Sequence, residues 1–253
     1  MDDTDASTAA DRPRAADPEA AGSDCDPDPA AADLQATYDR IASHFSKTRE
    51  YAWPEVEQFC AGRAGRRGLD VGCGNGRHTA LLAECTEHAI GGDVSRGLLD
   101  KASERARERG YADRVDFVQC AAERLPFAAG TIDIALYVAT IHHLSPRTER
   151  VASLNALARV LTDDGRALVS AWSTAHDRFD QDEASQRPND DSEHPTGFDT
   201  TVDWTLPGGT TVPRYYHIYS PAEFKAEIDD SELTLVSFEI SSGNCYAVVS
   251  PAV

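Results

Sequence analysis

The chain has 253 residues, of which 43 are Asp or Glu and 24 are Lys or Arg, so its formal net charge is −19. This length suits one α/β domain with additions, or at most two small domains. No apolar run approaches the roughly 20 residues of a membrane span, the acidic N-terminus does not begin like a signal peptide, and the acidity alone argues against a nucleic-acid partner.

The basic residues are almost all arginine, since the lysines are limited to Lys47, Lys101 and Lys225. Many acids with little lysine suit a protein that stays hydrated in concentrated salt, where the Debye length falls to about 3 Å at 1 M. The six cysteines form no CxxC pair and do not cluster with histidines. We therefore expect a halophile's cytoplasmic protein with reduced thiols and no metal site.

The N-terminal residues 1–32 carry nine acids and two arginines without a periodic apolar face, which predicts a disordered acidic tail. The remaining residues, 33–253, are expected to form one domain. A helical pattern begins at Asp33, and a second short helix is expected to end near Phe59.

The middle of the chain alternates short apolar strands with amphipathic helices. Strands are predicted at 66–71, 88–93, 114–120, 132–138 and 165–172, and helices at 76–85, 96–109 and 147–161. Ser145 and Pro146 are expected to be the N-cap and first residue of the last helix. This alternation indicates an α/β fold with a mostly parallel sheet covered by helices on both faces.

The last third begins with a polar segment, 173–213, which is predicted to be an insertion near the substrate side with a hairpin turn at Gly208-Gly209. Ser220 and Glu223 form a capping box that opens another helix. Two strands at 232–240 and 244–249 are too close for a parallel crossover, so the sheet should end in an antiparallel hairpin.

The sharpest motif runs from Leu69 to Gly76 and reads LDVGCGNG, an apolar strand that ends in an acid and a glycine-rich turn. A phosphate-binding P-loop would need Lys after the last glycine, where Arg77 stands. A dinucleotide fingerprint places its third glycine one residue later. Asp70 before the turn and Asp93 at the end of the next strand suit the cationic end and the ribose of S-adenosylmethionine.

These residues resemble motifs I and II of class I S-adenosylmethionine-dependent methyltransferases, and the resemblance extends from about Tyr38 to Val249. Within that superfamily the chain is similar to the tRNA wobble-uridine (5-carboxymethyluridine) carboxyl methyltransferases. The segments that carry this similarity are Tyr38-Asp39-Arg40-Ile41-Ala42, His44-Phe45, Thr48-Arg49, Trp53-Pro54, Leu125-Pro126-Phe127, Ile141-His142-His143-Leu144, Ala171-Trp172, Arg214-Tyr215-Tyr216-His217 and Asn244 to Val249.

The resemblance implies a Rossmann-like, mostly parallel seven-stranded sheet with a C-terminal antiparallel hairpin. It also implies methyl transfer to the carboxylate of 5-carboxymethyluridine at the tRNA wobble position. Ala121 stands where family members commonly have an acid, so adenine contacts would pass to the backbone or to Glu123. The implied cofactor-binding residues are Tyr38, Asp70, Gly72, Gly74, Asn75, Gly76, Asp93, Ala121, Ala122 and Val138.

A carboxylate is already nucleophilic at neutral pH, so the reaction needs alignment and donors more than a strong base. Candidate catalytic residues are Arg49, His142, His143 and Arg214, and the residues expected to bind the base are Trp53, Trp172, Tyr215, Tyr216 and His217. Each has a structural alternative: the arginines could pair with acids, His143 could cap a helix, Trp172 could be core, and one of the two tyrosines could pack inward.

The family's enzymes usually work with a small zinc-binding activator subunit. We expect such a partner on the edge strand at 114–120, through Val115, Phe117 and Val118. Two other functions stay open at this point. One is a methyltransferase for a small acceptor, such as a quinone precursor or a free carboxylic acid, and the other is a non-catalytic scaffold with the same fold.

Overall fold

The computed structural model describes residues 29–179 and 197–252. Residues 1–28 of the predicted tail 1–32 and residues 180–196 of the predicted insertion 173–213 lie outside the described residues, whereas residues 29–32 are helical, contrary to the prediction. Within the described ranges, no helix combines the length and the apolar character that a membrane crossing requires.

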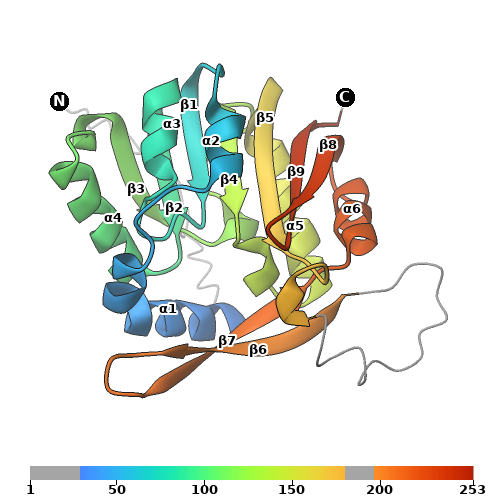
Figure 1. Ribbon diagram of the computed structural model, residues 1–253. Coiled ribbons are helices and arrows are strands. Elements are labelled where there is room, and N and C mark those ends of the chain that lie inside the picture. Colours follow the sequence, from blue (N-terminus) through green and yellow to red (C-terminus); the bar gives the residue numbers. More distant parts are fainter. Residues whose placement is uncertain (1–28, 180–196, 253) are drawn as a thin grey trace, which may run out of the picture.

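The central sheet has seven strands in the order β3-β2-β1-β4-β5-β9-β8 (Figure 1). The first five pair in parallel, and β9 and β8 complete the sheet in antiparallel fashion. This confirms the predicted mostly parallel sheet with its C-terminal hairpin. The strands are β1 (Gly65–Val71), β2 (Thr86–Asp93), β3 (Val115–Gln119), β4 (Ile132–Val138), β5 (Leu161–Trp172), β8 (Leu233–Ser241) and β9 (Asn244–Pro251).

Alternate residues of the central strands enter two different cores, as the period of two in a strand requires. Ala135 and Tyr137 of β4 pack with residues of α5 and α6, whereas Ile134 and Leu136 pack with residues of α2 and α3. Helices therefore cover both faces, as predicted. The helices are α1 (Pro29–Lys47), α2 (Pro54–Cys60), α3 (Thr79–Cys85), α4 (Arg96–Glu108), α5 (Arg147–Val160) and α6 (Pro221–Asp229).

A separate two-stranded hairpin, β6 (Phe198–Thr205) and β7 (Thr211–Ile218), lies beside α1 (Figure 1). Its turn contains Gly208 and Gly209, both with positive φ, which confirms the predicted turn. A small apolar cluster joins α1 to this hairpin and to α4 through Ile41, Val212 and Leu98. The hairpin thus forms one wall at the end of the sheet where the parallel strands stop.

Three predicted helix starts differ from the structure. α1 begins at Pro29 rather than Asp33, since proline is favoured in the first turn and three alanines follow. α3 begins at Thr79 rather than at Gly76, whose φ of 73° is left-handed. Pro146 is the N-cap of α5 and not its first helical residue, because its ψ of −173° is extended.

Candidate active site

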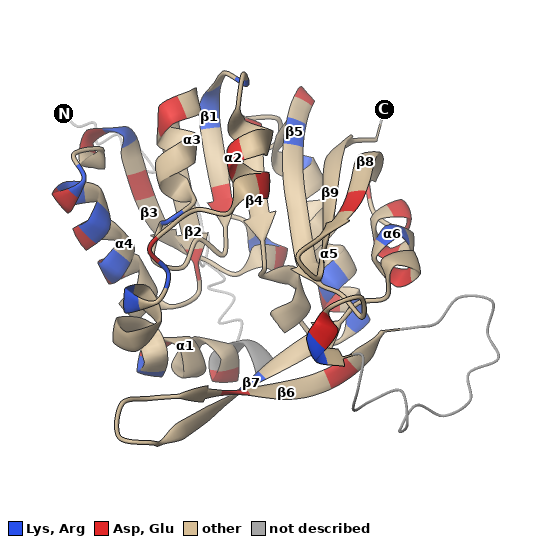
Figure 2. Ribbon diagram, viewed as in Figure 1, with Lys and Arg blue, Asp and Glu red and all other residues tan. Residues whose placement is uncertain are grey.

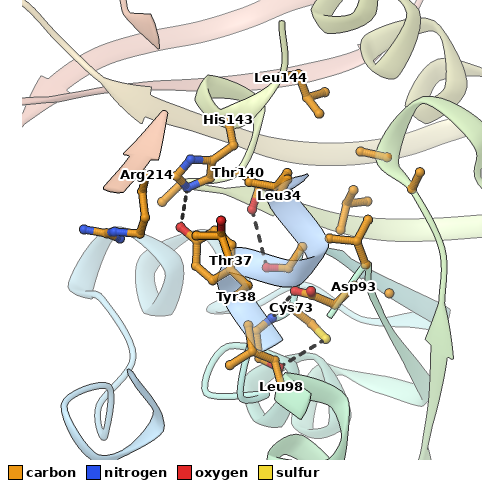
Figure 3. Close-up of a pocket in the computed structure, with 18 of the residues that line it drawn as sticks. Leu34, Thr37, Tyr38, Cys73, Asp93, Leu98, Thr140, His143, Leu144 and Arg214 are labelled. Atoms are coloured by element: carbon orange, nitrogen blue, oxygen red, sulfur yellow. Dashed lines mark hydrogen bonds between the residues drawn. The ribbon is translucent and has the colours of Figure 1, made fainter. Parts of the chain in front are cut away.

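A cavity of about 400 Å³ opens at the carboxyl ends of the parallel strands, between α1, the turn after β1 and the start of β7 (Figure 3). Ligands of open α/β sheets bind at this edge. The cavity brings together eleven of the residues singled out from the sequence. They are Tyr38, Gly72, Gly74, Asn75, Asp93, Ala121, Ala122, Val138, His143, Arg214 and Tyr215.

The turn after β1 requires glycine at position 72 for two independent reasons. Its φ is 70°, and a Cβ on this residue would lie 2.2 Å from Oγ1 of Thr140. The turn is fixed by the carbonyl of Gly92, which accepts the N–H groups of Gly72 at 2.8 Å and Cys73 at 3.0 Å. The backbone of the turn is therefore rigid and bare where it meets the cavity.

Asp93 stands at the end of β2 and is oriented by backbone donors. One carboxylate oxygen accepts the N–H of Gly74 at 2.8 Å, and the other accepts the N–H of Ser95 at 2.8 Å. Burial raises the pKa of Asp93 to about 6. Each oxygen keeps a second lone pair, so the ionised carboxylate can accept the two hydroxyls of a ribose.

Asp70 lies below the turn and is not part of the cavity lining in the described structure. Its Oδ2 accepts a 2.7 Å hydrogen bond from the hydroxyl of Thr79, the first residue of α3. Burial raises the pKa of Asp70 to about 7. Gly76 is likewise outside the lining, where its left-handed backbone starts the path into α3. Asp70 and Gly76 thus support the turn from positions outside the cavity lining.

Asn75 connects the turn to the end of α1. Its Nδ2 donates to the carbonyl of Arg49 at 2.9 Å and to that of Ser46 at 3.2 Å. Asn75 also lines the cavity, so one side chain links the expected cofactor site to the segment that carries Arg49.

The far end of the cavity is formed by the backbone after β3. Cys120, Ala121, Ala122 and Glu123 all line it. The Glu123 side chain is 12% exposed and lies 3.5 Å from Arg124. An acid therefore stands two residues beyond Ala121, at the same end of the cavity.

His143 lies at the centre of a short hydrogen-bond chain (Figure 3). Its Nδ1 is 2.9 Å from the carbonyl oxygen of Tyr215, which only accepts, so Nδ1 carries the proton. Its Nε2 then accepts the hydroxyl of Tyr38 at 2.8 Å. Burial lowers the pKa of His143 to about 4 and raises the pKa of Tyr38. At neutral pH both groups are uncharged, and His143 does not cap α5.

His142 occupies a different environment from its neighbour. It is 1% exposed, lies outside the cavity lining, and its Nδ1 accepts the N–H of Trp172 at 3.1 Å. Burial lowers its pKa well below the ordinary histidine value. The structure thus places His142 where it connects β4 to β5 rather than at the cavity.

The expected base-stacking residues are spread over the neighbouring structure. Tyr215 lines the cavity, and its hydroxyl donates to Asp199 at 2.8 Å. Tyr216 packs inward, as expected for one of the two tyrosines, and stacks on Trp172 with ring centroids 4.9 Å apart. Trp172 also packs against Phe179 at 6.0 Å. Tyr216, Trp172 and Phe179 thus pack against one another outside the cavity lining.

The two other expected stacking residues have structural partners. His217 is buried between two acids, with Nδ1 2.7 Å from Asp199 and Nε2 3.1 Å from Glu223, and its pKa is raised by these carboxylates against the effect of burial. Trp53 packs under the guanidinium of Arg77 at 4.7 Å and against His78. The structure places neither on the cavity lining.

Arg49 and Arg214 have no carboxylate within ion-pair distance among residues 29–179 and 197–252. Arg214 is 6% exposed and donates from Nη1 to the hydroxyl of Tyr216 at 2.7 Å. Arg49 donates to the carbonyl and hydroxyl of Thr48, both at 3.3 Å. Burial, together with the charge of Arg214, lowers the pKa of Arg49. Arg214 lines the cavity and Arg49 does not, and neither guanidinium is neutralised by a carboxylate among the described residues.

Three further residues belong to the site and were not expected from the sequence. Arg77 lines the cavity directly after the glycine turn, and Thr140 lies against that turn from the segment that follows β4. Trp204 lies in the hairpin, with Arg49 and Arg214 at 5.5 and 5.0 Å from its ring. Arg77 could have been found from its position beside the motif, whereas Trp204 stands in a segment with no periodic pattern.

The described residues contain no group of three or more His, Cys, Asp or Glu side chains placed to hold a metal ion. The donors around the cavity fit S-adenosylmethionine better. Asp93 suits the ribose, the bare turn admits a ligand against the backbone, and Arg77 supplies a cation near the methionine end expected at the turn.

Residues 69–165 match the sequence profile of a family described as "Methyltransferase domain". A protein of Encephalitozoon cuniculi whose name assigns it to the methyltransferases is 30% identical over 214 residues, which cover 84% of this chain and 92% of that protein. The chain belongs to the methyltransferase family. Its solved neighbours agree in fold: a DhpI complex with SAH has a TM-score of 0.63 at 17% identity, covering 88% of this chain and 97% of that one.

Relatives with a more specific name match part of their length. A tRNA (carboxymethyluridine(34)-5-O)-methyltransferase of Xenopus tropicalis is 38% identical over 55% of this chain and 21% of its own length. The Saccharomyces cerevisiae protein of the same name is 32% identical over 72% of this chain and 59% of its own length. The chain thus spans between about a fifth and three fifths of these two relatives.

One further neighbour is a methyltransferase solved in complex with the Haloferax volcanii Trm112 methyltransferase activator. It has a TM-score of 0.62 and is 14% identical, with 87% of this chain and 98% of that chain covered. At this identity the likeness concerns the fold.

Proposed function

We propose that this protein methylates the carboxylate of 5-carboxymethyluridine at the wobble position of tRNA and uses S-adenosylmethionine as the methyl donor. The observation that carries the proposal is the pair Arg49 and Arg214, whose guanidinium groups meet the same Trp204 ring and have no carboxylate within ion-pair distance among the described residues. Arg214 lines the cavity together with Tyr38 and His143, and Arg49 lies outside the lining but close enough to Tyr38 and Arg214 for their charges to act on it. The names of the relatives from Xenopus tropicalis and Saccharomyces cerevisiae support the same substrate.

The cofactor would lie along the turn after β1. Asp93 would accept its ribose hydroxyls, Gly72 and Gly74 would admit it against the backbone, and Ala121 to Glu123 would contact the adenine. Asp70 would act from below the turn as a negative charge and as the anchor of Thr79. S-adenosylmethionine, when bound, supplies a methyl group on a positively charged sulfur.

The protein's own groups fit a reaction that needs no strong base. A carboxylate is ionised at neutral pH, and the pKa of His143 near 4 keeps that imidazole neutral and occupied by Tyr38 and Tyr215. The arginines would bind one carboxylate oxygen and leave the other free to attack. Their work is orientation and charge compensation.

An RNA substrate agrees with the acidity if the protein works in concentrated salt. Counterion release then contributes little, so binding depends on short-range arginine contacts and stacking. Tyr215, which lines the cavity, and Trp204, which contacts Arg214, are the residues that we propose to meet a base. We accordingly infer a halophile's cytoplasmic enzyme. A small-molecule acceptor is not better supported, because nothing on the described surface singles one out.

The partner that we propose is a small zinc-binding activator on β3, one of the two outer strands of the sheet in the described structure. Val115 is buried by its own chain, and Phe117 packs toward Gly91, where a Cβ would approach it to 2.7 Å. Val118 and the unpaired backbone are thus what the edge would offer. Fully active, monodisperse protein without any activator would contradict this part.

The function is tested with anticodon stem-loops that carry 5-carboxymethyluridine, uridine or 5-carbamoylmethyluridine at the wobble position, incubated with labelled S-adenosylmethionine at molar salt. We expect methyl transfer to the carboxymethyl substrate alone, and loss of transfer in Arg214→Met. Transfer to the other two stem-loops, or none to the first with activator present, would contradict the substrate.

A further inference from the structure

Trp204 on β6 contacts two arginines, Arg49 and Arg214, that have no carboxylate within ion-pair distance among the described residues. The guanidinium of Arg214 lies 5.0 Å from the centre of its ring, and that of Arg49 lies 5.5 Å away. Arg49 comes from the segment after α1 and Arg214 from β7. One indole therefore meets two cations that the chain brings from opposite ends of its sequence.

The indole is itself held in place by α1. Its Nε1 donates to Nδ1 of His44 at 3.0 Å, and its ring lies 5.5 Å from that of Phe45. Trp204 also packs with Leu34 and Leu206 around the cluster that joins α1 to the hairpin. Its orientation is thus fixed by residues of α1 and of the hairpin itself.

Two guanidinium groups close to each other need compensation when they are partly removed from water. Arg214 is buried, and its Nε has no hydrogen-bond partner in the described structure. Aromatic faces supply attraction to a cation without consuming its charge, and this attraction strengthens as water is excluded. A carboxylate in the same place would instead neutralise the arginines and close the site to an anionic ligand.

We propose that Trp204 is a positioning residue that holds Arg49 and Arg214 together as one carboxylate clamp and so makes the site select a carboxylate over a carboxamide. The inference rests on the proposed function for the identity of the ligand. A carboxylate offers only acceptors to the two guanidinium groups. The NH2 of a carboxamide would face donors and stay unpaired, and a site built this way rejects such an analogue strongly.

The test compares Trp204→Leu, which keeps an apolar side chain without a π face, with Trp204→Phe, which keeps a ring. Phe238→Leu is the matched control, since it removes a ring 5.1 Å from Lys225 Nζ on the α6–β8 side of the fold. The assay measures KM and kcat for the carboxymethyluridine stem-loop, inhibition by its carbamoylmethyl analogue, and the dissociation constant of S-adenosylmethionine.

We expect Trp204→Leu to raise the KM for the RNA about tenfold and to lose most of the preference for the carboxylate, with cofactor affinity within about twofold of the wild type. Trp204→Phe, which keeps a ring, should have a KM much closer to that of the wild type, and Phe238→Leu should have the kinetics of the wild type. Equal kinetics of all three variants, or a Trp204→Leu defect confined to cofactor affinity, would overturn the inference.

A second readout does not depend on activity. The Nε–Hε resonances of Arg49 and Arg214, assigned with Arg49→Lys and Arg214→Lys, should both move in Trp204→Leu, although Phe45 at 5.2 Å from Arg49 and Tyr216 at 5.1 Å from Arg214 remain in place. Unmoved resonances would overturn the positioning role. If the wild type does not methylate the carboxymethyl stem-loop but Trp204→Leu still moves the two arginine resonances, the proposed substrate is refuted and the clamp is supported.

Discussion

An alanine at position 72 would place a methyl group where Thr140 already stands. The added Cβ would lie 2.2 Å from Oγ1 and 2.3 Å from Cγ2 of Thr140, and the backbone φ of 70° is one that alanine adopts with strain. Gly110 is the matched control. Its φ is 75°, but a Cβ there meets no heavy atom within 4 Å.

The two substitutions separate backbone strain from steric conflict. At Gly110 alanine should cost only the left-handed conformation, about 1–2 kcal/mol. At Gly72 the same strain is joined by overpacking, which typically adds about 1–3 kcal/mol. For a domain of this size each kcal/mol lowers Tm by about 2–4 °C, so Gly72→Ala should melt roughly 4–20 °C below the wild type.

Calorimetry of Gly72→Ala, Gly110→Ala and the double variant Gly72→Ala/Thr140→Ala measures these contributions in one buffer. The double variant removes the two closest contacts and should recover at least about 1 kcal/mol relative to additivity. If Gly72→Ala melts no lower than Gly110→Ala, the close approach of Thr140 to the glycine turn is not a constraint and the reasoning about the turn fails.

Three further predictions follow from buried charges. Burial holds the pKa of His143 at about 4, below the 6.5 of an unfolded chain, so the unfolded state binds more protons between these two values. The free energy of unfolding should therefore fall by up to about 3 kcal/mol as the pH drops from 6.5 to 4. Urea titrations of His143→Gln should lack this component, and the same pH dependence in variant and wild type would refute the prediction. Asp93→Asn should weaken S-adenosylmethionine binding roughly 10- to 100-fold in calorimetric titrations. The wild type should lose affinity below about pH 6, where Asp93 takes up a proton. Equal affinity of variant and wild type at pH 8 would contradict the ribose contact. Glu227→Gln should lower the free energy of unfolding by at least about 3 kcal/mol, because Arg150 is 4% exposed and lies 2.7 Å from that carboxylate. Asp230→Asn, at the exposed pair with Arg147, should lower it by less than about 1 kcal/mol. Similar losses for both variants in chemical denaturation would show that burial does not set the cost.

The order of elements could be predicted because strand and helix periods alternate clearly between Gly65 and Val160, and because the short link at Ser242 and Gly243 leaves room only for an antiparallel hairpin. Helix starts were less accessible. The start of α3 depends on the φ of Gly76, and the N-cap of α5 depends on the ψ of Pro146, which are properties of the folded backbone.

The residues that meet at the cavity could be predicted where they lie next to a motif, as with Gly72, Asp93 and His143. Side-chain direction could not. His142 and His143 are neighbours in sequence, yet one lies in the core against β5 and the other on the cavity, because the short 3-10 turn Ile141–His143 points them apart.

Trp204, in the predicted insertion 173–213, could not be predicted from the sequence. Trp204 is separated by more than 150 residues from Arg49, and only the folding of the hairpin against α1 brings the two together. Figure 2 shows how sparse Lys and Arg are on the hairpin strands, and in the sequences of β6 and β7 Arg214 is the residue of this kind. No spacing rule in the sequence links these three side chains.

The most direct test of the central claim is mass spectrometry of nucleosides from tRNA that carries 5-carboxymethyluridine, after incubation with the protein, its activator and S-adenosylmethionine at molar salt. The account predicts conversion of the wobble nucleoside to its methyl ester, a gain of one methylene in mass. Unchanged 5-carboxymethyluridine in the presence of protein that binds S-adenosylmethionine would contradict it.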